Sequence, residues 1–452
     1  MTVPTPADLV VHSATVLTGA GDPDRIDDAT LVVRAGRIAS IEAGGDRPPA
    51  TRTIDARGHV VTPGLVNVHT HTILTMVRGV AEDMGFAPAY TPGVPHGHEV
   101  TRDEAIALAR LGAVEALLFG STLINDAYVH ADAITPAMAE LGLRVWSCGR
   151  IHDVDFSRVH EGVWRHEAAI GERTLGEALD LHARWHGAAN GRIGVQLSPH
   201  APDNCTRRLL EDVREAAATR GLRVNTHLSQ SRLENERIRE REGCTPAELL
   251  DAVGLLNERL IAAHGMHVTA DDIERVGRAG ITLAHIPKGN ATGGVVAPTR
   301  ALAEAGVNLA LATDNMHADM VEAMRWALIV GRLQAGGIDG TWQPATALAM
   351  ATVNGARAMG LDHELGTLAV GKKADLVLFD FRRPHLVPHL ETAGNLLHTA
   401  QGRDVAMVVV DGEVVVEDGH PSKGDLETIM AEGQRAAEAL WARARAQVAG
   451  ER

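Results

Sequence analysis

The sequence predicts an α/β fold in which a (β/α)8 barrel, resembling the triosephosphate isomerase barrel, carries antiparallel β-structure at both chain ends. Between residues 64 and 359, short apolar runs alternate with longer helical patterns, as expected of repeated βα units around a parallel sheet. A hairpin pattern lies outside this region near each terminus. Polar residues that bind metals follow most of the apolar runs, at the point where active sites of such barrels form.

The barrel prediction rests on a count of eight strand candidates. Helical patterns rich in Ala, Leu, Glu and Arg separate them, at residues 102–118, 209–220 and 270–279 among others. The eight candidates are residues 64–71, 121–128, 144–150, 192–200, 223–229, 259–265, 281–288 and 308–315.

The terminal β-regions are predicted from turn signals. Residues 31–34 and 37–41 flank Ala35-Gly36, and residues 407–410 and 413–416 flank Asp411-Gly412. An Asp-Gly pair between apolar runs is the stronger of these two hairpin signals, because both central residues of such a turn need a positive φ angle.

Composition limits the class of protein. The net charge of -15 and the 3% aromatic content disfavour binding to nucleic acid or to an anionic membrane surface. Cys148, Cys205 and Cys244 show no CxxC spacing, which argues against disulfides and a thiolate zinc site. With neither a signal peptide pattern nor a membrane-length apolar run, we expect a cytoplasmic protein with no membrane partner.

Candidate metal ligands follow the strands. His69 and His71 end the first strand, and because side chains alternate along a strand, both imidazoles point to the same side. A lone histidine after an apolar run is more often a surface or core residue, and an HxH pair alone is a weak signal. The combination of several such residues at one level of a barrel favours a metal site. The other candidates are His200, His227, His264, His285 and Asp314, after strands four to eight.

These motifs resemble the amidohydrolase superfamily, within it the branch of triazine hydrolases and adenosine, cytosine and guanine deaminases. The resemblance covers nearly the whole chain. It rests on DARGHVVTPGLVNVHTH (55–71), RGVAED (78–83), SPHAPDNC (198–205), His227, His264, HIPKGN (285–290), AGVNLALATD (305–314) and GTLAVGKKADLVLF (366–379).

The resemblance implies a site with one divalent metal, zinc before iron, held by His69, His71, His227 and Asp314. Three imidazoles and a carboxylate suit either ion, and a water bound to the metal becomes a hydroxide nucleophile near neutral pH. Strand four lacks the lysine that bridges two metals elsewhere in the superfamily.

The remaining roles also come from the resemblance. Asp314 would accept the proton and pass it to the leaving group, while His264 would hydrogen-bond the hydroxide or the developing oxyanion. His200 and His285 would contact the substrate. The alternative for His200 is a capping or packing role in the SPHAP loop.

The resemblance further implies that the two chain ends join in one small β-sandwich. We expect residues 1–62 and 363–425 to form it, residues 63–362 to form the barrel, and residues 426–452 to form a C-terminal helix. We also expect a homo-oligomer that acts on a small molecule.

Two features depart from the deaminase pattern. His227-Leu228-Ser229-Gln230 carries glutamine where deaminases have a glutamate that protonates a ring nitrogen, and an amide cannot supply a proton. Gln230 is thus either a catalytic hydrogen-bond donor or a residue that orders the loop. The Gly- and Pro-rich residues 85–98 contain a second HxH, His96 and His98, which we interpret as a surface feature or lid contact rather than a second metal site.

Three functions remain open. The leading hypothesis is a hydrolase of non-peptide C–N bonds in an amide, urea or carbamate. The alternative is a heteroaromatic deaminase or dechlorinase. A barrel scaffold without catalysis is the third, and the intact ligand set disfavours it.

Overall fold

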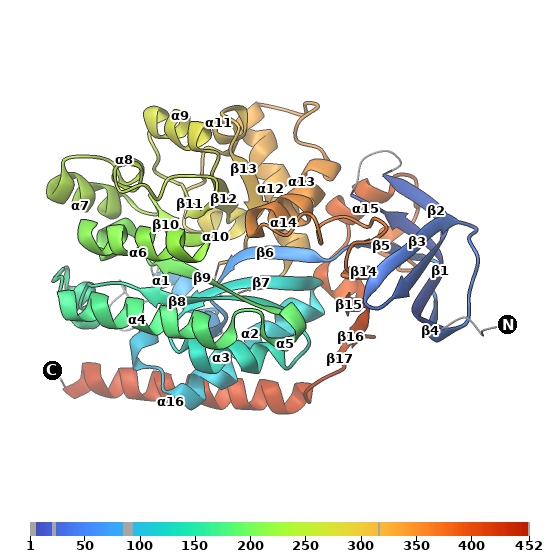
Figure 1. Ribbon diagram of the computed structural model, residues 1–452, viewed down its shortest axis with the longest axis horizontal. Helices are drawn as coiled ribbons and strands as arrows, with labels where there is room; N and C mark the ends of the chain where they lie inside the picture. Colours follow the sequence, from blue (N-terminus) through green and yellow to red (C-terminus); the bar gives the residue numbers. More distant parts are fainter. Residues whose placement is uncertain (1–5, 20–23, 85–93, 315–316, 451–452) are drawn as a thin grey trace.

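The chain folds into a barrel with a separate β-sheet at one end, as a computed structural model shows for residues 6–19, 24–84, 94–314 and 317–450 (Figure 1). The sheet formed by the chain ends lies to the right of the barrel in Figure 1, and the last helix runs along the lower side. Among the described helices, none is both long and apolar enough to cross a bilayer.

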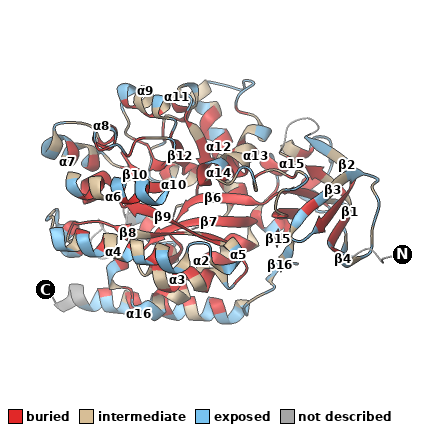
Figure 2. Ribbon diagram, viewed as in Figure 1, coloured by how far each residue is buried: buried red, intermediate tan, exposed pale blue. Residues whose placement is uncertain are grey.

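Eight parallel strands form the barrel in sequential order, which confirms the predicted fold class. They are β6 (Leu65–Thr70), β7 (Ser121–Tyr128), β8 (Arg144–Ile151), β9 (Ile193–Pro199), β10 (Val224–Leu228), β11 (Leu260–His264), β12 (Thr282–His285) and β13 (Asn308–Leu311). Nearly every residue of these strands is buried, as Figure 2 shows, because side chains fill the barrel interior and helices cover its outside.

The barrel closes between its first and last strands beside the predicted ligands. Thr70 forms a parallel bridge with Asp314. The backbone N–H of His71 donates to the Asp314 carbonyl (3.0 Å), and the N–H of Asp314 donates to the His69 carbonyl (3.1 Å). Closure therefore fixes three of the candidate ligands relative to one another.

Helices cover the barrel, and several begin at a serine or threonine whose side chain accepts a backbone N–H. The helices of the barrel are α1 (Ala81–Met84), α2 (Arg102–Leu118), α3 (Ala131–Ala139), α4 (Ala168–Trp185), α5 (Ala188–Gly191), α6 (Arg207–Arg220), α7 (Arg232–Glu242), α8 (Pro246–Ala252), α9 (Ala270–Ala279), α10 (Pro287–Thr292), α11 (Thr299–Glu304), α12 (Met320–Ala335), α13 (Pro344–Ala351) and α14 (Val353–Met359). Two more are α15 (Thr392–His398) and α16 (Leu426–Gly450).

The second sheet combines strands from both chain ends. Its order is β17-β16-β15-β14-β5-β1-β2-β3, with β4 also paired to β1. The strands are β1 (Ala7–Leu17), β2 (Arg25–Arg34), β3 (Arg37–Ala43), β4 (Ala50–Asp55), β5 (His59–Pro63), β14 (Leu376–Asp380), β15 (Val405–Val410), β16 (Glu413–Glu417) and β17 (His420–Pro421). Apolar side chains from β1, β2, β5, β14 and β15 pack together as a core of their own.

Both predicted hairpins are present in this sheet. Ala35 and Gly36 have φ angles of 49° and 69°, and Asp411 and Gly412 have 50° and 77°, as two-residue turns of this kind require. The exact division into residues 1–62, 63–362, 363–425 and 426–452 stays a prediction.

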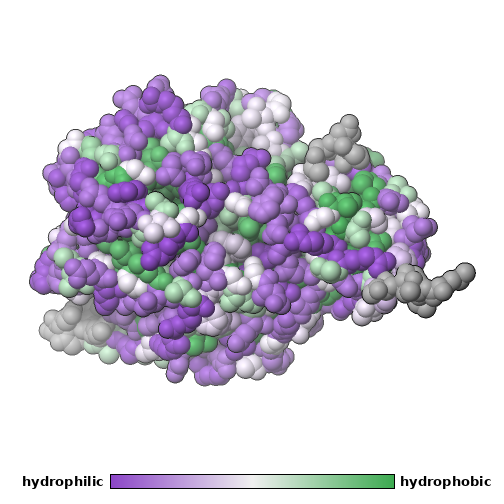
Figure 3. All heavy atoms as spheres, in the orientation of Figure 1, coloured by the Kyte–Doolittle hydropathy of each residue, from purple (hydrophilic) through white to green (hydrophobic). Residues whose placement is uncertain are grey.

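The visible surface is mostly polar. On the face drawn in Figure 3, hydrophilic side chains predominate and apolar side chains form scattered patches.

Candidate metal centre

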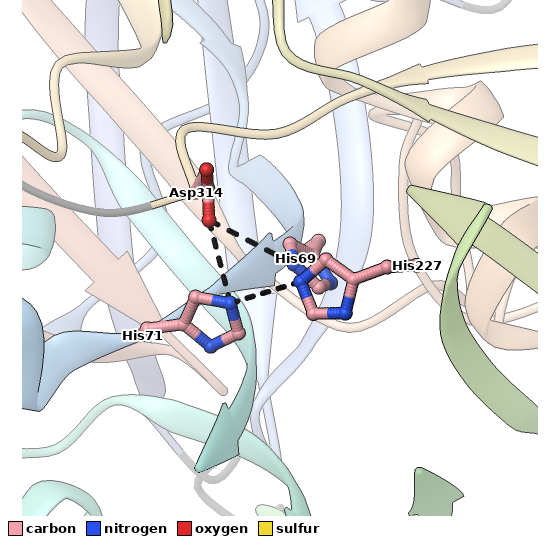
Figure 4. Close-up of side chains that lie close together, drawn as sticks. All are labelled: His69, His71, His227 and Asp314. Atoms are coloured by element: carbon pink, nitrogen blue, oxygen red, sulfur yellow. Dashed lines mark hydrogen bonds and ion pairs between the residues drawn. The ribbon is translucent and has the colours of Figure 1, made fainter. Parts of the chain in front are cut away.

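Three histidines and an aspartate meet at the carboxyl ends of the barrel strands. His69 is the last residue but one of β6, and His71 directly follows that strand. His227 lies on β10, and Asp314 follows β13. One ligand atom of each lies within 4.8 Å of those of the others. Figure 4 shows all four side chains pointing toward one another. The Nε2 atom of His71 is 3.3 Å from Oδ1 of Asp314 and 3.4 Å from Nε2 of His227.

The other ring nitrogen of each histidine has an oxygen partner. The Nδ1 of His69 lies 2.9 Å from Oδ1 of Asn225. The Nδ1 atoms of His71 and His227 lie 2.6 Å from the carbonyl oxygens of Ala127 and His200. Because these oxygens only accept hydrogen bonds, each Nδ1 carries the hydrogen and each Nε2 presents its lone pair to the centre.

This arrangement fits a divalent cation. Two facing Nε2 lone pairs 3.4 Å apart repel each other unless a positive charge lies between them. The Nε2 of His69 is buried and has no hydrogen-bond partner within the described parts of the chain. Three neutral nitrogens and one carboxylate match a zinc-type ligand set. The predicted site for one divalent metal is therefore present.

Burial sets the protonation of the ligands. It lowers the pKa of His69 to about 4 and holds the pKa values of His71 and His227 well below the usual range. Burial also raises the pKa of Asp314 to about 7. The imidazoles are thus neutral and ready to bind a metal at neutral pH, whereas Asp314 must give up a proton.

His264 lies beside the group, with its ring stacked on that of His227 at a centroid distance of 5.3 Å. Its Nδ1 is 3.0 Å from Oδ1 of Asn290, so its Nε2 carries a lone pair. His264 and Asp314 have φ angles of 74° and 63°, in the left-handed region that non-glycine residues seldom occupy. Such strain is common at functional sites.

The other predicted residues also lie at this end of the barrel. The ring of His200 is 4.7 Å from that of His227, and its Nε2 accepts a hydrogen bond from Arg150 (3.0 Å). His285, at the end of β12, is fully buried, and neither ring nitrogen has a hydrogen-bond partner among the described residues. Gln230 is buried in the turn after β10.

Sequence reasoning missed Arg150, which is the last residue but one of β8 and is 7% exposed. Its guanidinium lies 4.3 Å from the ring centroid of Phe156 and 5.6 Å from that of Tyr128, and Tyr128 in turn packs on His71. A hollow of about 470 Å³ opens beside Arg150 and Tyr128. Arg150 ends a predicted strand, so the rule that found the histidines would have found it had cations been considered.

The second HxH pair, His96 and His98, belongs to the described residues, and residues 85–93 of the same loop lie outside them. His98 stacks on Phe156 at a centroid distance of 4.8 Å, and His96 lies 5.2 Å from His160. Neither residue belongs to the metal-binding group found among the described residues.

Barrel and ligand set together define a class of metal-dependent hydrolases. The chain belongs to the amidohydrolase family, whose sequence profile matches residues 60–415. The predicted class, a metal-dependent hydrolase of non-peptide C–N bonds, is confirmed at this level.

Two relatives match this chain over most of its length. The chain is 36% identical over 420 residues to the 5-methylthioadenosine/S-adenosylhomocysteine deaminase of Moorella thermoacetica, covering 90% of this chain and 94% of the relative. It is 34% identical over 447 residues to the 5'-deoxyadenosine deaminase of Methanosarcina mazei, covering 97% and 99%. These relatives fit the alternative prediction, a deaminase, equally well.

Solved structures share the fold. A zinc-bound adenosine deaminase from Xanthomonas campestris matches with a TM-score of 0.86 and 26% identity over 97% of this chain and 99% of that one. Atrazine chlorohydrolase from Arthrobacter aurescens TC1, complexed with zinc, matches with a TM-score of 0.84 and 22% identity over 95% and 100%. The second likeness concerns the fold alone.

Proposed function

We propose that the protein hydrolyses the C–N bond of an amide, urea or carbamate in a small molecule. The observation that carries this choice within the family is Gln230, a buried amide three residues after the ligand His227. Attack on an aromatic C–NH2 carbon costs ring aromaticity, and protonation of the adjacent ring nitrogen offsets part of that cost. An amide side chain cannot protonate it, but it can donate a hydrogen bond to a carbonyl oxygen.

In this proposal His69, His71, His227 and Asp314 hold one divalent ion, zinc before iron, which supplies a water-derived nucleophile at neutral pH and polarises the carbonyl. Asp314 takes the proton of the attacking water and delivers it to the departing nitrogen. Once the metal has displaced its proton, the carboxylate of Asp314 is a base able to carry this proton between the two steps.

Four further side chains act on water or substrate in this proposal. His264, with its Nε2 lone pair, accepts a hydrogen bond from the attacking water and so orients it. Gln230 donates a hydrogen bond to the carbonyl oxygen. His200 and His285 border the substrate. These roles follow from position and from hydrogen-bonding capacity.

Heteroaromatic deamination is the second candidate, and a specific observation favours it. Both relatives described above, a 5-methylthioadenosine/S-adenosylhomocysteine deaminase and a 5'-deoxyadenosine deaminase, match nearly the whole chain. In this chemistry Gln230 would hold the ring, and Asp314 would be the group able to supply the proton.

A substrate screen separates the two candidates. Zinc-reconstituted protein is incubated with small amides, ureas, carbamates and amino-heterocycles, and product masses are measured. We expect turnover of a carbonyl compound, a loss of about 10-fold in turnover for Gln230→Ala, on the scale of one hydrogen bond, and no gain for Gln230→Glu. A preference for amino-heterocycles, or a faster Gln230→Glu protein, would favour the deaminase. Metal content near zero without turnover would instead favour a scaffold.

We further propose that the protein is a homo-oligomer of the cytoplasm. Ile329 and Leu333, one turn apart on α12, are 43% and 75% exposed, and Ile338 beyond the helix end is 77% exposed, which supports an apolar interface. The three cysteines are free, as expected in a reducing compartment. Light scattering of wild type and Leu333→Glu tests the interface, and a monomeric wild type would refute it.

A further inference from the structure

The turn that carries Gln230 has an unusual backbone. Directly after β10, Ser229 has a φ angle of 47°, in the left-handed region where a Cβ atom is unfavourable. The backbone N–H groups of Ser229 and Gln230 both donate to the carboxyl group of Glu234. Ser229 binds Oε1 and Gln230 binds Oε2, each at 2.8 Å. Two successive N–H groups around one acceptor form an anion-binding nest.

Glu234 is itself held firmly. Its side chain is 1% exposed, and its backbone N–H donates to the hydroxyl of Ser231, which caps α7. Burial, and then the charge of the nearby Asp203, raise the pKa of Glu234 above its usual range, while the two backbone N–H groups lower it. A buried carboxyl group in such a place needs a strong compensating interaction, and the two N–H groups supply it.

Helix α7 also contacts the loops on either side of this turn. Asn235 donates to the carbonyl of His267 (2.8 Å) in the loop after His264. Arg241 donates to the carbonyls of Pro202 (2.9 Å) and Cys205 (2.8 Å) in the loop after His200. The helix is therefore bonded to three successive loops, which carry His200, Gln230 and His264.

We infer that Glu234 is a positioning residue for the reaction: it holds the left-handed turn at Ser229 and thereby fixes where the side chain of Gln230 points. Glu234 bonds the backbone of the turn and acts on the substrate only through Gln230. Without its two acceptor oxygens, Ser229 would relax toward an ordinary φ angle, and Gln230 would lose its fixed orientation. The inference rests on the proposed role of Gln230 as a substrate contact.

Glu234→Gln tests the inference with little change in size. An amide nitrogen has no lone pair to offer, so one of the two N–H groups loses its acceptor whether or not the glutamate carries a proton. The matched control is Glu236→Gln on the same helix, where the side chain is exposed. Zinc content is measured for every variant, because a merely structural defect that reached His227 would lower it.

The decisive measurement is a double-mutant cycle in kcat/KM between Glu234→Gln and Gln230→Ala, with the best substrate from the screen. We expect each single variant to lose about 10-fold, on the scale of one hydrogen bond. The double variant should lose no more than Gln230→Ala alone, with about one zinc per chain and an unaffected control.

The inference is overturned if the two losses in kcat/KM add to about 100-fold in the double variant, or if Glu234→Gln has wild-type kinetics. It is also overturned if kcat/KM falls in Glu234→Gln but not in Gln230→Ala, or if Glu234→Gln loses its zinc. The cycle works with whichever substrate class the screen delivers. A preference for amino-heterocycles would therefore refute the proposed function without deciding the role of Glu234.

Discussion

Each histidine of the metal group binds an oxygen through its Nδ1, and for His69 that oxygen belongs to Asn225. The bond selects the tautomer in which Nε2 can bind the metal. We predict that Asn225→Ala weakens zinc binding by about 10- to 100-fold, because the ring can then rotate or change tautomer. Competition with a chromophoric chelator measures the affinity.

A suitable control for Asn225→Ala is Asn257→Ala, since Asn257 precedes β11 at the other end of the barrel. This control should bind zinc as the wild type does. Unchanged affinity in Asn225→Ala would mean that packing alone holds the imidazole of His69.

The buried carboxyl group of Asp314 should couple zinc binding to one proton. Its pKa is raised to about 7, so below pH 7 the metal-free protein carries a proton there that zinc must displace. The histidines hold none in this range, because burial lowers their pKa values, that of His69 to about 4. Zinc affinity should therefore fall by about 10-fold per pH unit between pH 7 and pH 5.

Chelator competition at several pH values, corrected for protonation of the chelator, gives this slope. Asp314→Asn should flatten it. A change of about three in the logarithm of zinc affinity per pH unit would contradict the prediction, since it would mean that the imidazoles also take up protons.

The metal ligands could be predicted from the sequence, but the oxygen atoms that accept hydrogen bonds from their Nδ1 atoms could not. His69 and His71 could be predicted because alternation along a strand places them on one side. The partners of Nδ1 come from three other segments: Ala127 on β7, Asn225 on β10, and the carbonyl of His200 after β9. No spacing in the sequence relates a histidine to a backbone carbonyl that lies more than 20 residues away.

Elements whose stability comes from apolar burial were predicted closely. Residues 121–128 and 102–118 coincide with β7 and α2, both of which bury many apolar side chains. Helix α7 was not among the helical stretches named from the sequence, and its residues explain why. Of its eleven residues only Glu234 and Ile238 are buried, so it lacks an apolar stripe and is held by polar contacts to neighbouring loops.

Two Asp-Gly turns of the chain-end sheet allow a matched test of backbone strain and crowding. Asp411-Gly412 and Asp418-Gly419 have the same φ angles, 50° and 77°. A Cβ atom on Gly412 would lie 2.9 Å from Cγ1 of Val33 and 3.0 Å from Cα of Gly36, whereas one on Gly419 would meet nothing within 4 Å. Gly419→Ala should cost about 1 kcal/mol for the φ angle alone.

Gly412→Ala should cost about 2 to 4 kcal/mol, because overpacking adds to the same backbone strain. Thermal unfolding of both variants against wild type measures the difference. Equal losses would show that the neighbouring hairpin moves aside at no cost.

At the scale of the whole molecule, the local sequence pattern could not predict that strands from the two chain ends pair with each other. His59 pairs with Asp380 in the register of β5 and β14, more than 300 residues apart in the chain. Strand candidates at both ends were visible, but nothing in either one names its partner, so only resemblance to a family predicted that they join. The barrel could be counted because its neighbouring strands follow one another in the sequence.

One buried ion-pair cluster connects the barrel to this second sheet. Arg144, at the start of β8, is 1% exposed. It donates to Asp375 (3.0 Å), which directly precedes β14, and to Asp411 (2.8 Å), which directly follows β15. Arg192 and Lys373 also lie near Asp411, at 3.1 and 3.4 Å. Asp411 therefore keeps cations if Arg144 is removed, whereas Asp375 loses the one cation bonded to it among the described ion pairs.

We therefore predict that Arg144→Met lowers the free energy of unfolding by about 3 to 5 kcal/mol, the usual cost of leaving a buried charge without its partner. Arg144→Met combined with Asp375→Leu should recover part of the loss, because the stranded carboxylate is gone. Folded protein of both variants should still bind one zinc, since Arg144 lies at the opposite end of β8 from Arg150 and the metal group. Urea denaturation with zinc analysis measures both properties. An Arg144→Met protein as stable as wild type would show that the cluster does not hold the sheet to the barrel, and that apolar packing between them is sufficient.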